Sequence, residues 1–162
     1  MSIWITALRA MDIQPLVFLA RVVPDYLASS QPLYGIGFML LAVAVSAAAI
    51  ELILGIPAFL MLRKLHRASW VSVAVAGLGL GAFPAAFPWP GHLEGFSAGQ
   101  NWHGTSVETF VNGMPTTYAW LTYGEGVLFF ALHGVIGALV FYAIWRRLER
   151  PTKSLQSHAG DG

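Results

Sequence analysis

Three ionisable side chains stand inside long apolar stretches of this sequence, and they are the first candidates for chemistry. Glu51, Glu125 and His133 each have mainly hydrocarbon side chains around them. A charged group in hydrocarbon is costly, so carboxyl and imidazole groups inside a membrane commonly mark proton, ion or ligand sites. From the helical rise, we expect Glu51 and His133 at similar depth and Glu125 about 12 Å from His133, nearer the outer face.

Two interpretations of these side chains stay open. The functional one is a proton or cation path that runs through Glu125, His133 and Glu51. The structural one is a buried Glu51–His133 hydrogen bond that fixes helix packing, or a protonated Glu51 that bonds to the backbone, because hydrocarbon disfavours the ionised carboxylate. A path usually needs more polar lining than three groups, which favours the structural interpretation.

A single histidine in a membrane also raises the question of a cofactor. Haem iron accepts axial histidine, so His133 is the one residue through which haem, or a quinone, would be contacted. A second axial histidine is not well placed, since His66, His92 and His103 lie in predicted links. The sequence therefore predicts no cofactor and no metal site.

The sequence also lacks the patterns of the common enzyme classes. It contains no cysteine, no phosphate-binding glycine loop and no nucleophile elbow. Basic residues form no patterned surface beyond the helix flanks, so nucleic acid is not an expected partner. We expect a protein without catalytic residues that is not an enzyme.

The elements that hold these residues must be helices in lipid, as the composition indicates. Of 162 residues, 56% are hydrophobic and only 10% are charged, whereas soluble domains carry about 25% charged residues. Such a chain has too few charges to cover a water-facing surface. We predict an all-α integral membrane protein whose main partner is the lipid bilayer.

Three segments are apolar enough and long enough to cross a bilayer, which takes roughly 20 residues. The predicted spans are residues 33–62, 70–87 and 118–145. Residues 1–32 form an amphipathic segment that suits the membrane interface. The alternative is a fourth span at about residues 3–23, which would bring Arg9 and Asp12 into the membrane at a considerable cost unless they pair.

Basic residues set the orientation, because Lys and Arg stay on the cytoplasmic side. Seven of the nine lie in the link at residues 63–69 or in the tail at residues 146–162, and residues 68–145 have none. We therefore predict the inner membrane of a bacterium, a cytoplasmic C-terminus, and a periplasmic link at residues 88–117.

The periplasmic link carries a strong hairpin signal. Asn112-Gly113 suits a type I′ turn, in which both central residues need positive φ. We predict strands at residues 107–111 and 114–118, although Pro115 weakens the second strand as a ladder member.

Small residues on two predicted spans indicate close helix packing. Gly77 and Gly81 form a G-x-x-x-G pair, and Gly134 and Ala138 form a similar pair on the last span. Such pairs let another helix approach closely. Because the chain has several small-residue faces and few helices, we expect one face to serve another subunit or a second copy.

Aromatic side chains in and around the periplasmic link are of the types that dominate protein interfaces. They are Trp89, Phe96, Trp102, Phe110 and Trp120. With the small-residue faces, they favour a non-enzymatic accessory or partner-binding subunit of a membrane complex. Proton or ion transport is the first alternative, and a small haem- or quinone-contacting protein is the second.

Overall fold

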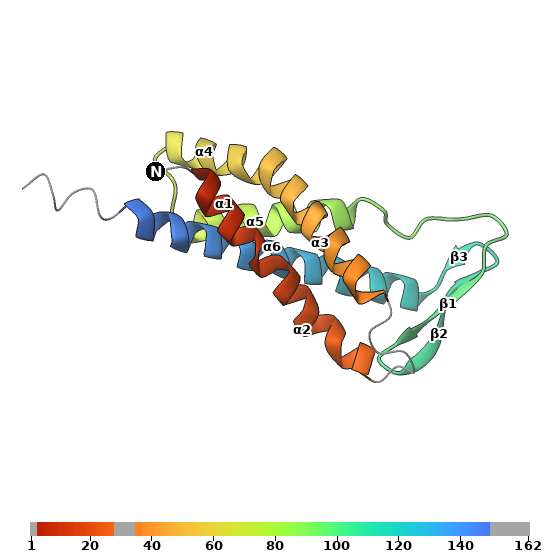
Figure 1. Cartoon of the computed structure of the whole chain (residues 1–162). Helices are drawn as coiled ribbons and strands as arrows, with labels where there is room; N and C mark the ends of the chain where they lie inside the picture. Colours follow the sequence, from red (N-terminus) through yellow and green to blue (C-terminus); the bar gives the residue numbers. More distant parts are fainter. Residues whose placement is uncertain (1–2, 28–34, 150–162) are drawn as a thin grey trace, which may run out of the picture.

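The computed structural model describes residues 3–27 and 35–149. Within them lie the helices α1 (Ile3–Met11), α2 (Ile13–Leu27), α3 (Ile36–Ile50), α4 (Ile56–Lys64), α5 (Trp70–Ala86) and α6 (Thr117–Glu149), and the strands β1 (Ala98–Trp102), β2 (Thr105–Val111) and β3 (Met114–Pro115). A π-helical turn, η1 (Glu51–Gly55), joins α3 to α4. The helices form an elongated bundle, and the sheet stands at one end of it (Figure 1).

Parts of three predicted segments lie outside the described residues. These are residues 1–2 and 28–32 of the N-terminal segment, residues 33–34 of the first span and residues 150–162 of the tail. Residues 146–149 belong to the last turn of α6.

The predicted predominance of long apolar helices is confirmed. In the described part of the chain, three helices are long and apolar enough to cross a membrane, at Ile3–Ala20, Ile36–Lys64 and Thr117–Glu149. The second and third correspond to the spans predicted at residues 33–62 and 118–145. The span predicted at residues 70–87 is α5, whose 17 residues make it shorter than the other three.

The N-terminal helices lie in the bundle. The sequence predicts an interfacial segment here, with a fourth span as the alternative. In the structure, α1 and α2 run obliquely across α6, and α1 buries Thr6, Ala7 and Ala10 (Figure 1). Small buried residues at three- to four-residue spacing give α1 a packing face against α6. The stretch Ile3–Ala20 also has the length and the apolar composition that the fourth-span alternative requires.

The helices α5 and α6 form the closest pair. An added Cβ on Gly77 would lie 2.5 Å from the Cβ of Ala138, and one on Gly134 would lie 3.0 Å from the Cα of Gly81. The two backbones therefore meet at a separation that only glycine allows at these positions.

Two tyrosines of α6 fix α5 near both of its ends. The Tyr123 hydroxyl donates to the carbonyl of Ala86 at 2.7 Å, and the Tyr142 hydroxyl donates to the carbonyl of Ala68 at 2.9 Å. The bond at Ala86 satisfies a carbonyl that the helix itself leaves without a partner. Together the two bonds set the position of α5 along α6.

The buried core lies at the end of the bundle opposite the sheet. The Phe59 ring meets the rings of Phe141 and Trp145 edge to face, each with centroids 5.0 Å apart. The other buried members of this core are Ala7, Ala10, Ile56, Val73 and Tyr142. Towards the sheet the bundle loosens, because α3 packs on α2 and barely contacts α5 or α6. No residue of α3 is buried.

The π-helical turn has a cause in the sequence. Pro57 stands two residues after the end of the turn. It has no N–H to donate to the preceding turn, and its ring crowds the carbonyl four residues earlier. A locally wider turn accommodates proline without breaking the helix. Glu51 begins this turn and Gly55 ends it.

The sheet is a three-stranded antiparallel meander, in the order β1-β2-β3. The predicted hairpin is present, with φ of 48° at Asn112 and 83° at Gly113. The strand predicted at residues 114–118 is wrong in length, because β3 ends at Pro115 and α6 begins at Thr117. A second two-residue turn, at His103 and Gly104, joins β1 to β2. The strand β1 was not predicted from the sequence.

Candidate functional site

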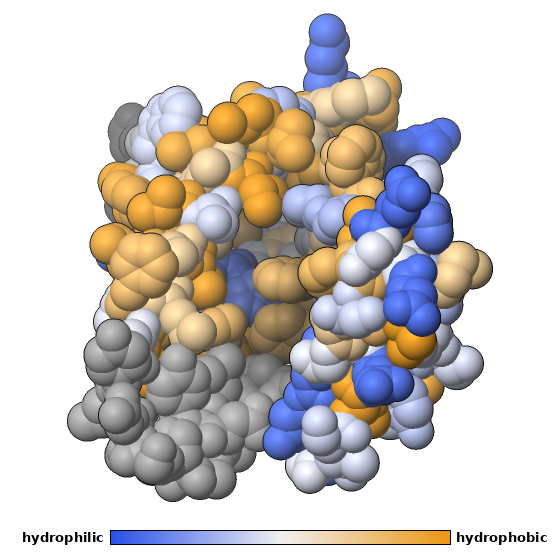
Figure 2. Space-filling view, turned by 90° about the vertical axis from the view of Figure 1, so that its right-hand side faces the viewer, coloured by the Kyte–Doolittle hydropathy of each residue, from blue (hydrophilic) through white to orange (hydrophobic). Residues whose placement is uncertain are grey.

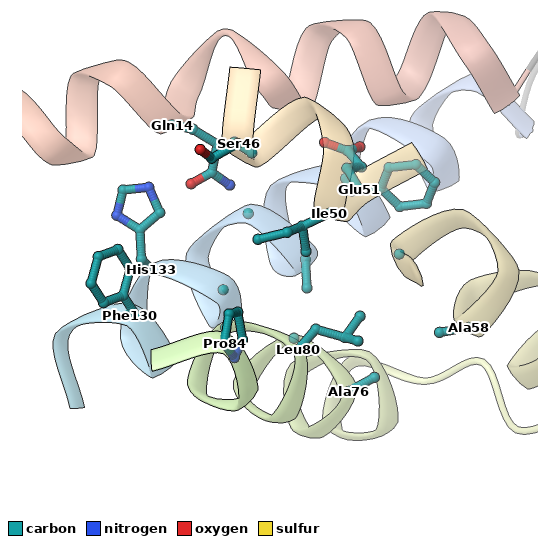
Figure 3. Close-up of a pocket in the computed structure, with 18 of the residues that line it drawn as sticks. Gln14, Ser46, Ile50, Glu51, Ala58, Ala76, Leu80, Pro84, Phe130 and His133 are labelled. Carbon is teal, nitrogen blue, oxygen red and sulfur yellow. The ribbon is translucent and has the colours of Figure 1, made fainter. Parts of the chain in front are cut away.

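A cavity of about 470 Å³ lies between the helix Ile36–Lys64 and the α5–α6 pair. This volume is within the range of small-molecule sites, roughly 300–1,000 Å³. The walls are mostly aliphatic, phenyl and glycine groups, and the polar side chains among them are Gln14, Ser46, Glu51 and His133. Figure 3 shows the cavity and its lining residues, which come from α2, from the helix Ile36–Lys64, from α5 and from α6.

The cavity is closed at one end and open at the other. At the end away from the sheet, its lining residues Phe59, Val73 and Phe141 are buried. At the end nearer the sheet, its lining residues Pro84 and Phe130 are exposed. Figure 2 views the molecule from the sheet end and shows a hollow between hydrophobic surfaces.

Three of the residues that line the cavity each have a buried side-chain polar atom without a hydrogen-bond partner among the described residues. These atoms are Gln14 Oε1, Glu51 Oε1 and His133 Nδ1. They come from α2, η1 and α6, so three separate segments bring them to one cavity. Buried polar atoms are nearly always hydrogen-bonded in folded proteins, which makes three unpaired atoms in one cavity the strongest sign of a site.

Local features of the chain position these side chains. An added Cβ on Gly137 would collide with the Gln14 side-chain amide, so this glycine makes room for Gln14 across α6. The π-helical turn sets the direction of Glu51, and such turns are frequent at functional sites. The His133 ring lies against Phe129, with centroids 5.7 Å apart.

The structure brings two of the three predicted ionisable groups to the cavity. Glu51 and His133 both line it, although Glu51 Oε1 and His133 Nδ1 are not bonded to each other. Glu125 is not part of the lining. Its Oε2 accepts a hydrogen bond from Trp102 Nε1 at 2.9 Å and lies 3.2 Å from His103 Nε2. Glu125 thus holds β1 and its turn against α6, away from a path through the other two groups.

The small residues proposed for helix packing meet one another within this chain. Gly77 and Gly81 on α5 face Gly134 and Ala138 on α6, and all four also line the cavity. Their lack of bulk therefore has two effects, a close helix contact and open space beside it.

The five aromatic residues predicted for outer interactions divide into two groups. Trp89, Phe96 and Trp120 are exposed. Trp102 packs on Tyr118 at a centroid distance of 5.5 Å, and Phe110 packs on Phe96 at 5.3 Å. Trp102 and Phe110 therefore pack within the sheet region, whereas Trp89, Phe96 and Trp120 keep large exposed fractions.

Phe96 belongs to a larger apolar surface, which we name the hairpin-tip patch and define as Leu93, Phe96, Val111 and Met114. Their exposed fractions are 49%, 45%, 39% and 60%. Gly113 links them, since it accepts a hydrogen bond from Leu93 N and donates one to Phe96 O. Val111 and Met114 are direct cross-strand partners beside the turn.

Gln14 is the main site residue that sequence reasoning missed. It is only 8% exposed, although it falls in the segment predicted to lie at the interface. The signal that would have found it is its spacing from Ala7 and Ala10, which places all three on one helix face.

Comparison with known proteins adds no family or function, since no family model, no curated protein sequence and no solved structure matches this chain.

Proposed function

We propose that this chain is an integral protein of a bacterial inner membrane that crosses the bilayer four times. The four spans are α1 with α2, α3 with α4, α5, and α6. The start of α1 and the end of α6 both lie on the cytoplasmic side. The basic residues support this orientation. Arg63 and Lys64 end α4, Arg146 and Arg147 lie in the last turns of α6, and the described N-terminus lies at the same end of the bundle (Figure 1). Lys and Arg mark the cytoplasmic side.

The exposed surface of the helices supports the bilayer as solvent. Large apolar side chains cover α3, where Phe38 is 76% exposed, and continue through the π-helical turn at Ile53. An apolar surface this long would be unfavourable in water, whereas it suits the hydrocarbon of a membrane. The helix Ile36–Lys64 has 29 residues and is long enough to cross it.

We further propose that the protein is a non-enzymatic accessory subunit that binds another protein of a membrane complex in the periplasm. The observation that carries this proposal is the hairpin-tip patch. Lipid can cover the helices, but the sheet stands beyond the end of the bundle (Figure 1). Exposed apolar patches of this kind mark sites of interaction, and exposed phenyl and methionine side chains are enriched at protein interfaces.

A double substitution in the patch tests this function. We expect the wild-type protein, solubilised gently from its native membrane, to elute with a second protein in a fixed ratio. Phe96→Ser with Met114→Ser should abolish that association while the helical circular dichroism stays unchanged. The matched control, Gln100→Ser with Glu108→Gln, changes exposed positions of the same sheet and should keep the partner.

Light scattering during the chromatography separates the outcomes. A wild-type protein without any second component, or a patch variant that keeps the partner in the same ratio, would refute the proposal. A wild-type particle of twice the protomer mass would assign the patch to a second copy of this chain and not to a different subunit.

A further inference from the structure

We propose that the interhelical cavity binds a neutral, membrane-soluble ring compound whose head carries hydroxyl or carbonyl groups, which is the chemistry of isoprenoid quinones and quinols. This inference is independent of the hairpin-tip patch, because it rests on the three unpaired polar atoms at Gln14, Glu51 and His133. A bound head group would supply the hydrogen bonds that the chain does not.

The chemistry of the walls favours a neutral head. Gln14 offers a carbonyl acceptor and amide donors, and His133 Nδ1 either donates or accepts according to its tautomer. A protonated Glu51 donates as well as accepts. A quinone carbonyl can accept a hydrogen bond from His133 or from protonated Glu51, and a quinol hydroxyl can donate one to the Gln14 oxygen. This set suits a small head with both kinds of group.

Charge argues against an anionic head. Among the described residues that line the cavity there is no lysine or arginine, and the acidic or basic side chains among them are Glu51 and His133. A fatty-acid carboxylate or a lipid phosphate would meet no fixed cation there, and an ionised Glu51 would repel it. Phosphate and carboxylate sites normally include Arg or Lys.

Water does not account for the whole cavity. An ordered internal water needs two to four polar partners. Among the described lining residues, polar side chains stand at four positions, Gln14, Ser46, Glu51 and His133, so water finds side-chain partners in only part of a space of about 470 Å³. The remaining volume is lined by groups such as Leu80, which favour an apolar ligand.

The shape of the cavity gives the ligand an entrance. The buried rings of Phe59 and Phe141 close the inner end, whereas Phe130 and Pro84 at the other end are exposed. Since α3 barely contacts α5 or α6, a hydrocarbon tail could leave between them into lipid while the head stays against Gln14 and His133.

Binding of short-chain probes to the full-length protein in lipid nanodiscs tests this inference. The probes are decyl-benzoquinone and its reduced quinol, with decylbenzene, decanoic acid and decyltrimethylammonium as comparison compounds. Equilibrium dialysis against empty nanodiscs corrects for partition into lipid. We expect saturable binding of the quinone or the quinol, and none of the three comparison compounds should compete.

Variants then assign the binding to the cavity. Gln14→Leu and His133→Phe should each weaken binding roughly tenfold, the effect of losing one buried hydrogen bond. Glu51→Gln keeps a donor and an acceptor and should stay within about threefold of the wild type. The controls His92→Phe and Gln100→Leu lie outside the cavity and should leave binding unchanged.

Each contrary result has a defined meaning. Equal binding of decylbenzene would show that the polar atoms do not select the head, and binding of the cation alone would overturn the proposed class. If the folded wild-type protein binds no probe, the cavity is not such a site. Should a polar variant fail to fold, Ala76→Phe fills the cavity from α5 and must abolish binding; unchanged binding would overturn the proposed location.

Discussion

Substitution of Gly81 by alanine should loosen the contact between α5 and α6 on which the cavity depends. The added Cβ would collide with the carbonyl oxygen of Phe130 and would lie 3.1 Å from the Cα of Gly134. Both neighbours are backbone atoms, so neither can rotate out of the way. The two helices must therefore separate or shift.

The size of the effect follows from these contacts. Carbon atoms pack best at about 3.5–4.0 Å, so the backbones must move apart by several tenths of an ångström or more. Overpacking of this kind typically costs about 1–3 kcal/mol. We expect Gly81→Ala to lower the free energy of unfolding by that amount.

Gly79→Ala supplies a matched control on the same helix. An added Cβ at Gly79 meets nothing within 4 Å, and alanine has a higher helix propensity than glycine by about 1 kcal/mol. Gly79→Ala should therefore leave stability unchanged or increase it. The two variants add the same methyl group two residues apart, so only its surroundings differ.

The assay is equilibrium unfolding in mixed micelles with increasing dodecyl sulfate, followed by far-ultraviolet circular dichroism. Gly81→Ala should unfold at a lower mole fraction of dodecyl sulfate than the wild type, and Gly79→Ala should not. Equal stability of Gly81→Ala and Gly79→Ala would refute the close approach of α5 and α6 at this position.

Two further predictions concern contacts made by α6. Tyr142→Phe removes the hydrogen bond to the Ala68 carbonyl and should lower the free energy of unfolding by about 1 kcal/mol in the same assay; an unchanged midpoint would contradict a role for this bond. Glu125→Ala removes the acceptor for Trp102 Nε1, so amide hydrogen exchange in β1 should accelerate roughly tenfold while exchange in α5 stays the same. Equal exchange in β1 with and without Glu125 would show that this carboxylate does not hold the sheet.

The long apolar helices and one turn follow directly from sequence patterns. Long apolar stretches with a single charged residue inside each predict the helices Ile36–Lys64 and Thr117–Glu149, because hydrocarbon tolerates few charges over the roughly 20 residues of a span. Asn112-Gly113 predicts its turn because the backbone there requires positive φ. In both cases the information is local in the chain.

The site depends on tertiary contacts that local patterns do not contain. Counting residues along helices predicts relative depth, but it does not give the direction of a side chain around the bundle. Glu125 turns to Trp102 at the end of β1, a strand that was not expected, and to His103 in the turn that follows it. Gln14 reaches the cavity because Gly137 leaves space opposite it on α6, a helix far away in the sequence but adjacent in the fold.

The strand β1 has a different reason for being missed. Its sequence, Ala-Gly-Gln-Asn-Trp, has little β propensity and no apolar alternation. It becomes a strand because β2 offers it a hydrogen-bonding edge and because Trp102 is held by α6.

Labelling of single cysteines with a membrane-impermeant maleimide tests most directly whether lipid surrounds this bundle in the proposed orientation. The chain has no cysteine of its own, so each introduced thiol reports on one position. We predict that Ser106→Cys in the sheet reacts once the outer membrane is made permeable, that Arg67→Cys reacts only when the inner membrane is also broken, and that Leu41→Cys on α3 reacts in neither case. Labelling of Leu41→Cys at the rate seen for Ser106→Cys would place α3 in water and contradict the membrane assignment.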